Sequence, residues 1–144
     1  MKLLIAGSRS YSNQLIRVVT LLDQILDSEP SYAGDGWWDR LDITEVISGC
    51  ASGIDHAGIV WAENHSIPVK KMPADWKKFG VSAGFKRNEE MAKLCDYGII
   101  IWDGKSHGTN HMTDMMNKYD KEFLLWTKLP VKPNRGPRVV SVAM

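Results

Sequence analysis

Five short apolar runs alternate with segments of helical periodicity along most of the chain, and this alternation restricts the fold more than any other feature. The apolar runs cover residues 2–6, 43–47, 67–72, 97–102 and 123–126, and the helical segments cover residues 13–26, 54–65, 83–94 and 109–119. Apolar positions recur every three or four residues within the helical segments. A β-α-β alternation of this kind predicts a doubly wound parallel sheet with right-handed crossovers.

The run YGIIIW at residues 97–102 lacks the alternation of a half-exposed strand. Such a run is typical of a central parallel strand that helices cover on both faces. We therefore predict an α/β protein with a Rossmann-like, three-layer α/β/α architecture and a mostly parallel five-stranded sheet. Residues 1–127 form the predicted domain, and residues 128–144, which include Pro130, Pro133 and Pro137, form an extended basic tail.

The chain has 144 residues, which suits one domain with a substantial hydrophobic core. Its apolar runs are all far shorter than the roughly 18 residues that a membrane-spanning helix needs. The run near the amino terminus, Leu3–Ala6, is also too short for a secretory signal, whose apolar core needs about 7–15 residues. We therefore expect a cytoplasmic protein, in the host cytoplasm if the chain is viral, with no membrane partner.

Glycine-rich or polar turns follow four of the predicted strands, at residues 7–11, 48–55, 73–76 and 103–109. The carboxyl ends of parallel strands share one edge of the sheet, and ligands bind at that edge. Small residues there let backbone N–H groups approach a phosphate, and the helices that follow present their positive ends to it. The sequence thus predicts a phosphate-binding site at this edge.

Two familiar phosphate-binding motifs are excluded. Residues 104–106 (GKS) resemble the end of a P-loop, but the glycine that a P-loop requires upstream would stand at Ile99, inside a predicted strand. The first strand is followed by GSR at residues 7–9 rather than by the GxGxxG fingerprint of dinucleotide-binding proteins.

The ordered set GSRSY, SGCASGIDHAGIVWAE, GFKRNEEMA and WDGKSHGT resembles the SLOG superfamily over about residues 2–126. Within it, the chain is most similar to the small YspA-like, YpsA-related proteins of bacteria and phages. The superfamily also includes DNA-processing protein A and the lonely-guy phosphoribohydrolases. This resemblance implies a Rossmann-like fold that binds nucleotides or nucleotide-derived ligands, either as a signal sensor or as a nucleotide-processing enzyme.

The turns and the resemblance together predict a set of ligand-binding residues. Arg9 would offer a guanidinium fork to a phosphate or ribose. Asp55 would accept a ribose hydroxyl or only cap its helix, and these alternatives stay open. Arg87 and Asn88 would contact the ligand, with a solvated helix face as the alternative. The predicted set is Gly7, Ser8, Arg9, Ser48, Gly49, Gly53, Asp55, Arg87, Asn88, Asp103, Gly104, Gly108 and Thr109.

Phosphoribohydrolases of the superfamily carry a glutamate in a Gly-Thr-x-x-Glu segment, and the resemblance places Met112 at that position. Methionine cannot act as an acid or base or stabilise an oxocarbenium-like centre. We therefore predict a binding protein for a nucleotide or a nucleotide-derived small molecule, rather than an enzyme. The alternative is an enzyme that acts at an N-glycosidic bond, with Asp103, Asp55, Glu89 or Glu90 as its carboxylate.

A second alternative is single-stranded nucleic-acid binding, for which the basic tail and the nearby Trp126 are the support. Residues 127–144 carry four basic residues and no acidic one, which leaves 14 basic against 17 acidic residues in the rest of the chain. An acidic body repels phosphates. For this reason we do not expect nucleic acid as a partner.

The remaining predictions concern metals, cofactors and association. No spacing of cysteines and histidines fits a metal site, so we predict no metal and no cofactor. Because related folds commonly associate, a homo-oligomer is consistent with the sequence. Trp37 and Trp38 lie in a polar insertion, and we expect them to cover an edge of the core.

Overall fold

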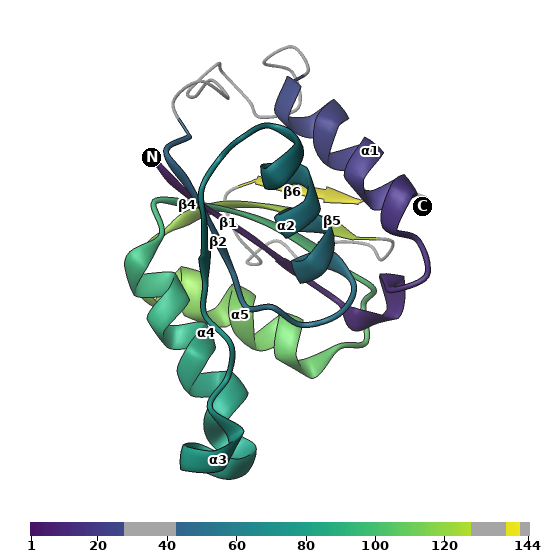
Figure 1. Cartoon of the computed structure of the whole chain (residues 1–144). Helices are drawn as coiled ribbons and strands as arrows, with labels where there is room; N and C mark the ends of the chain where they lie inside the picture. Colours follow the sequence, from purple (N-terminus) through teal and green to yellow (C-terminus); the bar gives the residue numbers. More distant parts are fainter. Residues whose placement is uncertain (28–42, 128–137, 142–144) are drawn as a thin grey trace.

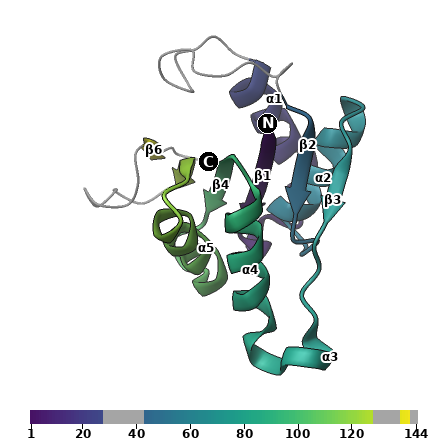
Figure 2. The same ribbon diagram turned by 90° about the vertical axis from the view of Figure 1, so that its left-hand side faces the viewer.

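The computed structural model describes residues 1–27, 43–127 and 138–141, and Trp37 and Trp38 lie outside these ranges. A parallel sheet lies between helices on both of its faces, which confirms the predicted α/β, Rossmann-like architecture (Figures 1 and 2). The strands are β1 (Lys2–Gly7), β2 (Glu45–Ser48), β3 (Val69–Lys71), β4 (Tyr97–Trp102), β5 (Glu122–Thr127) and β6 (Arg138–Ser141). The helices are η1 (Arg9–Tyr11), α1 (Leu15–Asp27), α2 (Ile54–Asn64), α3 (Trp76–Phe79), η3 (Gly80–Ser82), α4 (Ala83–Leu94) and α5 (His107–Lys118).

The strand order in the sheet is β3-β2-β1-β4-β5-β6, and every neighbouring pair is parallel. The five predicted strands form in the predicted order along the chain, and β6 adds a sixth strand at the edge of the sheet. It pairs with β5 from Leu124 opposite Arg138 to Thr127 opposite Ser141. β6 follows the last proline of the segment, Pro137, so each of its residues has an N–H group that can join a ladder.

Side chains of the central strands pack alternately on the two faces of the sheet. Leu3 and Ile5 belong to the core cluster on the side of α1 and α2, whereas Leu4 and Ala6 belong to the cluster that contains Met91 of α4. Residues 99–101 of β4 divide between the clusters in the same way. Because helices cover both faces, the positions from Leu3 to Ala6 and from Ile99 to Ile101 are all apolar and buried, as predicted from the YGIIIW run.

The order of the strands reverses between β1 and β4, which are neighbours at the centre of the sheet. Chain segments leave the carboxyl ends of these two strands toward opposite faces, which opens a crevice between them. Between β3 and α4, the short helices α3 and η3 form a projection beyond this edge, which we call the arm (residues 76–82) (Figures 1 and 2).

No helix in the described part of the chain is long and apolar enough to cross a bilayer. The cytoplasmic location stays a prediction. Cys50 and Cys95 are both free thiols; Cys95 is buried in the core and Cys50 is half-buried.

Candidate functional site

A pocket of about 400 Å³ lies at the carboxyl edge of the sheet, between the turn after β1 and the loop after β4. Its walls also include the first turns of α2, α4 and α5 and part of the arm. The predicted site residues that line it are Gly7, Arg9, Asp55, Arg87, Asn88, Asp103, Gly108 and Thr109. The predicted residues that do not line it are Ser8, Ser48, Gly49, Gly53 and Gly104.

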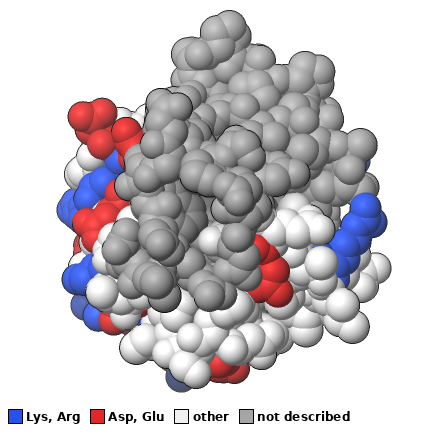
Figure 3. Space-filling view, turned by 90° about the horizontal axis from the view of Figure 1, so that it is seen from above, with Lys and Arg blue, Asp and Glu red and all other residues white. Residues whose placement is uncertain are grey.

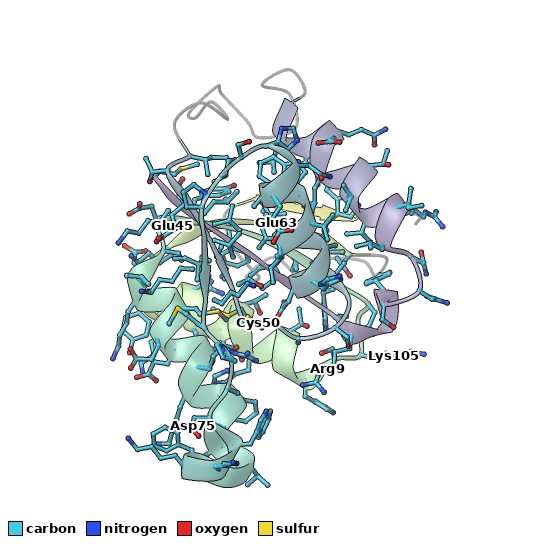
Figure 4. All side chains as sticks on the ribbon, viewed as in Figure 1. Arg9, Glu45, Cys50, Glu63, Asp75 and Lys105 are labelled. Atoms are coloured by element: carbon cyan, nitrogen blue, oxygen red, sulfur yellow. The ribbon has the colours of Figure 1, made fainter. Side chains whose placement is uncertain are left out.

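The turn after β1 is fixed to the loop after β4. The Ser8 side chain is buried, and its Oγ accepts a hydrogen bond from the Asp103 N–H at 3.0 Å and lies 3.4 Å from Thr109 Oγ1. A Cβ at Gly7 would contact the carbonyl oxygen of Ile101. Ser8 therefore holds two walls of the pocket together, whereas the exposed Arg9 extends from the edge of the sheet (Figure 4).

The loop after β2 is also held by its own hydrogen bonds. Ser48 Oγ donates to the carbonyl oxygen of Asp55 at 3.1 Å and accepts from the Cys50 N–H at 3.2 Å. Gly53 has a φ of +84°, and a Cβ there would contact the carbonyl oxygen of Ser8. Ser48 and Gly53 thus shape the loop from behind the pocket.

Asp55 joins this loop to the turn after β1. Its Oδ1 accepts from the Gly7 N–H at 3.2 Å and its Oδ2 from the Ala51 N–H at 3.3 Å. Burial raises the pKa of Asp55 to about 6, against the lowering effect of Arg87, the two N–H groups and Arg9. The group therefore changes charge close to neutral pH, inside the pocket.

Arg87 and Asn88 connect α4 to both sides of the pocket. Arg87 donates from Nη1 to the carbonyl oxygen of Gly49 at 2.6 Å and from Nε to Asn88 Oδ1 at 3.1 Å. Asn88 Nδ2 donates to the carbonyl oxygen of Gly108 at 3.1 Å and lies 3.2 Å from Nδ1 of His111. Arg87 is not a solvated helix residue, because protein oxygens orient its guanidinium toward the pocket.

Gly49 has a steric role in this arrangement. A Cβ at residue 49 would lie 2.6 Å from Arg87 Nη1 and 2.9 Å from Asp55 Oδ2. The absence of a side chain therefore lets the guanidinium and the carboxylate approach the same loop.

Asp103 organises the loop that leads into α5. Its Oδ1 accepts from the N–H groups of Lys105 and Ser106 at 2.8 and 2.9 Å, and its Oδ2 accepts from Ser10 Oγ at 2.7 Å. Burial alone would raise the pKa of Asp103, but these hydrogen bonds hold it below its ordinary value. Gly104, at the centre of the loop, has a φ of +85°.

The amino-terminal turns of three helices converge on the pocket. They contribute Asp55 from α2, Phe85 from α4, and Gly108 and Thr109 from α5, all of which line it. Each helix end carries a partial positive charge and N–H groups without intrahelical partners. Together with Arg9 and Arg87, these ends make the pocket suitable for an anion, and a phosphate is the anion that such sites bind most often.

An aromatic wall stands beside this anion site, and the sequence prediction missed it. Phe85 is 50% exposed and stacks on His111, with ring centroids 4.1 Å apart and planes inclined by 21°. Burial lowers the pKa of His111, which favours the neutral form of the ring. Trp76 of the arm lines the same pocket. The signal was present in the sequence, because Phe85 belongs to the GFKRNEEMA segment and Trp76 ends the third predicted turn.

Of the four carboxylates considered for catalysis, Asp55 and Asp103 line the pocket. Glu89 instead lies 3.5 Å from Lys93 and 3.6 Å from Lys118, and Glu90 is exposed. Within the described ranges, no group of three or more His, Cys, Asp and Glu side chains is placed to hold a metal ion.

Comparisons with known proteins show what the chain is similar to in fold. No protein-family model matches it, and no curated protein matches its sequence. Among solved structures, DNA processing protein A from Streptococcus pneumoniae matches with a TM-score of 0.64 and 16% identity, over 97% of this chain and 58% of that one. DNA processing protein A from Helicobacter pylori matches with a TM-score of 0.53 and 20% identity, over 94% of this chain and 68% of that one.

These likenesses show the Rossmann-like fold, while the resemblance to the SLOG superfamily and to its YspA-like proteins stays a prediction. This chain spans less than two thirds of the length of the Streptococcus pneumoniae protein. The Helicobacter pylori structure describes a single-stranded DNA binding mode. This finding contradicts our prediction that nucleic acid is not a partner, and the prediction is therefore wrong. It relied on net charge, which sums the whole surface, whereas phosphate binding depends on the local electrostatic field.

Proposed function

We propose that the chain binds single-stranded nucleic acid, with one nucleotide of the strand in the pocket. The observation that carries this proposal is the presence of an anion site and an exposed aromatic wall in the same cavity. A nucleotide in a strand presents the matching pair of groups, a phosphate and a flat base. The cavity of about 400 Å³ falls within the size range of small-molecule and nucleotide sites.

The phosphate would lie against the first turns of α4 and α5, within reach of Arg87. The contacts to Gly49 and Asn88 fix the orientation of this guanidinium before any ligand arrives. Its Nη2 has no hydrogen-bond partner among the described residues, so the free edge of the fork is available to a phosphate oxygen.

The base would stack on Phe85. His111 supports the buried face of this ring and leaves the other half-exposed in the pocket wall. Every base has a π-face, so a stacking platform binds single strands without demanding a sequence. A duplex hides those faces, and the proposed site therefore selects unpaired nucleotides.

The fold likeness adds support, because a protein of the same fold is described by its binding of single-stranded DNA. The fold likeness also favours a single-stranded nucleic acid over the free nucleotide-derived ligand that was the leading prediction from the sequence.

Fluorescence anisotropy with a labelled single-stranded oligodeoxynucleotide and with the matching duplex tests the proposal. We expect preference for the single strand and a loss of affinity of at least about 10-fold for Arg87→Ala, because a charge-assisted contact to phosphate is removed. The matched control is Arg17→Ala, which removes the same charge from an exposed position on α1.

Three results would contradict the proposal. The first is the absence of oligonucleotide binding, and the second is equal affinity for the duplex. The third is an affinity for free nucleotides that equals the affinity for the strand, which would support the small-molecule ligand predicted from the sequence.

A further inference from the structure

The arm is short, yet it exposes three large apolar side chains to solvent. Residues 75–81 are all exposed. Trp76 is 53% exposed, Phe79 38% and Val81 97%, and Ile16 and Phe85 are the other large exposed hydrophobic residues among those described. Since a four-residue helix gains no stability from facing these groups to water, the surface suits a ligand.

Basic side chains surround these apolar groups. Lys77, Lys78 and Lys86 lie within or next to the arm, and the Nζ atoms of Lys78 and Lys86 are 5.1 and 4.8 Å from the centroid of the Phe79 ring. The nearest carboxylate in sequence, Asp75, accepts the N–H of Lys78 at 3.1 Å as the cap of α3. Aromatic rings beside cations are the combination by which proteins hold the bases and phosphates of a single strand.

The arm is continuous with the pocket. Trp76 and Val81 line it together with Phe85 and Arg87. A Cβ at Gly84 would lie 3.5 Å from Cη2 of Trp76, so the indole rests on the start of α4 next to Phe85. Trp76 of the arm and Phe85 of α4 therefore belong to one wall of the pocket, and His111 of α5 stacks on the Phe85 ring.

The opposite side of the arm has a different character. A groove of about 520 Å³ there is lined by Phe79 and Lys86 but also by Asp75, Glu89 and Glu90. Arg87 also lines this groove, but its three carboxylates outnumber the two basic residues. The side of Trp76 is therefore the more favourable path for a strand that leaves the pocket.

We propose that the arm binds the nucleotide next to the one in the pocket. Trp76 stacks on the neighbouring base, and Lys77 and Lys78 contact the phosphates that follow. This inference rests on the proposed function, and it makes the ligand a strand of several nucleotides rather than one nucleotide at its end.

A length series tests the inference. Thymidine 5′-monophosphate, a thymidine dinucleotide and a longer thymidine oligonucleotide are titrated into wild type, Trp76→Ala, Trp76→Phe and Arg87→Ala. We expect Trp76→Ala to weaken the longer oligonucleotide by about 10-fold more than it weakens the monophosphate, because only the longer ligand has a second base to stack on the indole. Trp76→Phe should retain most of the affinity, while Arg87→Ala should weaken ligands of every length.

The lysines give an independent readout. For Lys77→Ala combined with Lys78→Ala, the slope of log affinity against log salt should become shallower by about 0.7 for each lost phosphate contact with a single strand. Circular dichroism spectra identical to wild type show that these surface variants fold.

The outcomes separate the two proposals. If no ligand binds, or if Arg87→Ala has no effect, the proposed function fails. If the oligonucleotide binds through Arg87 but Trp76→Ala and the lysine variant bind it like wild type, only the inference about the arm fails. A dimer of wild type that Trp76→Ala converts to monomer, with DNA affinity unchanged, would also overturn it, because the arm would then bind a second copy of the chain.

Discussion

At the scale of single residues, the pocket depends on positions where a side chain cannot be accommodated. Gly53 adopts a φ of +84°, and a Cβ there would contact Ser8 O and lie 2.8 Å from the Cα of Arg9. We expect Gly53→Ala to lower the free energy of unfolding by at least about 2 kcal/mol, from backbone strain and steric overlap. Urea denaturation measures this change.

The matched control for that substitution is Gly108→Ala. A Cβ at residue 108 would have no atom within 4 Å, and this glycine lies in the first turn of α5 with an ordinary backbone conformation. Its free energy of unfolding should stay equal or rise by up to about 1 kcal/mol, because alanine favours a helix. Equal destabilisation by both substitutions would contradict the steric role of Gly53.

The raised pKa of Asp55 predicts that the free energy of unfolding depends on pH. Its pKa is about 6 in the folded chain and 3.8 in its ordinary environment, because burial disfavours the charged form. The folded state therefore holds its proton more tightly than the unfolded state. The stability that this proton contributes is fully present below pH 3.8 and is lost as the pH rises through about 6.

This dependence is measured by urea denaturation at a series of pH values. In Asp55→Asn, the fall in the free energy of unfolding between pH 3.8 and about 6 should become smaller. At low pH the variant should be about as stable as wild type, since an amide, like a protonated carboxyl, is uncharged and accepts hydrogen bonds chiefly through one oxygen. A wild-type profile that rises over this interval and is the same in the variant would show that Asp55 is not the titrating group.

The serines show why residue roles were only partly predictable. Ser8 and Ser48 follow strands in glycine-rich turns, as ligand-binding hydroxyls do, yet both are buried. Ser8 is bonded to the loop after β4, and Ser48 is bonded within its own loop and to the start of α2. A hydroxyl has the same local sequence context in both roles. Arg87 and Asn88 line the pocket, and their predicted contact with a ligand stays a prediction.

At the scale of elements, periodicity predicted the five strands and four long helices within a few residues of their observed bounds. It did not predict α3 and η3, since elements of three or four residues are too short to show a helical period. It also gave no reason to place β6 in the sheet, because pairing in a parallel ladder depends on a partner far away in the sequence. Part of the aromatic wall lies on α3, which is too short to show a helical period, and the wall was therefore not predicted.

The position of β6 leads to a prediction about truncation. Removing residues 138–144 leaves β5 as the edge of the sheet, without the partners that Leu124–Thr127 have in the complete chain. We expect a loss of about 2 kcal/mol in the free energy of unfolding, because each backbone hydrogen bond contributes about 0.5–1.5 kcal/mol. Faster hydrogen exchange at the amides of β5 should accompany the loss.

The control for the truncation removes only residues 142–144, which leaves β6 in place. If the longer deletion unfolds at the same urea concentration as this control, the ladder between β5 and β6 contributes nothing to stability.

At the scale of the whole molecule, the net charge of +1 conceals an uneven distribution. Basic and acidic side chains lie next to each other on the end opposite the arm, as seen on the left of Figure 3. The pocket and the arm combine Arg9, Arg87 and three lysines with the positive ends of helices, and the carboxyl groups in the pocket are those of Asp55 and Asp103. Total charge therefore gave the wrong expectation about nucleic acid, because a sum over the surface carries no information about where the charges lie.

Ionic strength tests this local field. The affinity for a single-stranded oligonucleotide should fall linearly on logarithmic axes as salt increases, with a slope of about −0.7 for each phosphate contacted. Arg9→Ala should make the slope shallower, while Arg17→Ala, on the far side of the sheet, should not change it. A slope of zero for wild type would show that the strand is not held by its phosphates.

The pairing of β1 with β4 determines when during folding the pocket first exists. Leu3 lies opposite Tyr97 and Gly7 opposite Ile101, so the two strands that frame the pocket are distant in sequence and adjacent in space. A nascent chain that has only emerged as far as β3 contains the turn after β1 but neither α4 nor the opposite wall. Ligand can therefore bind only after this long-range pairing has formed, and its binding free energy is added to the cooperative unfolding of the central sheet as a whole.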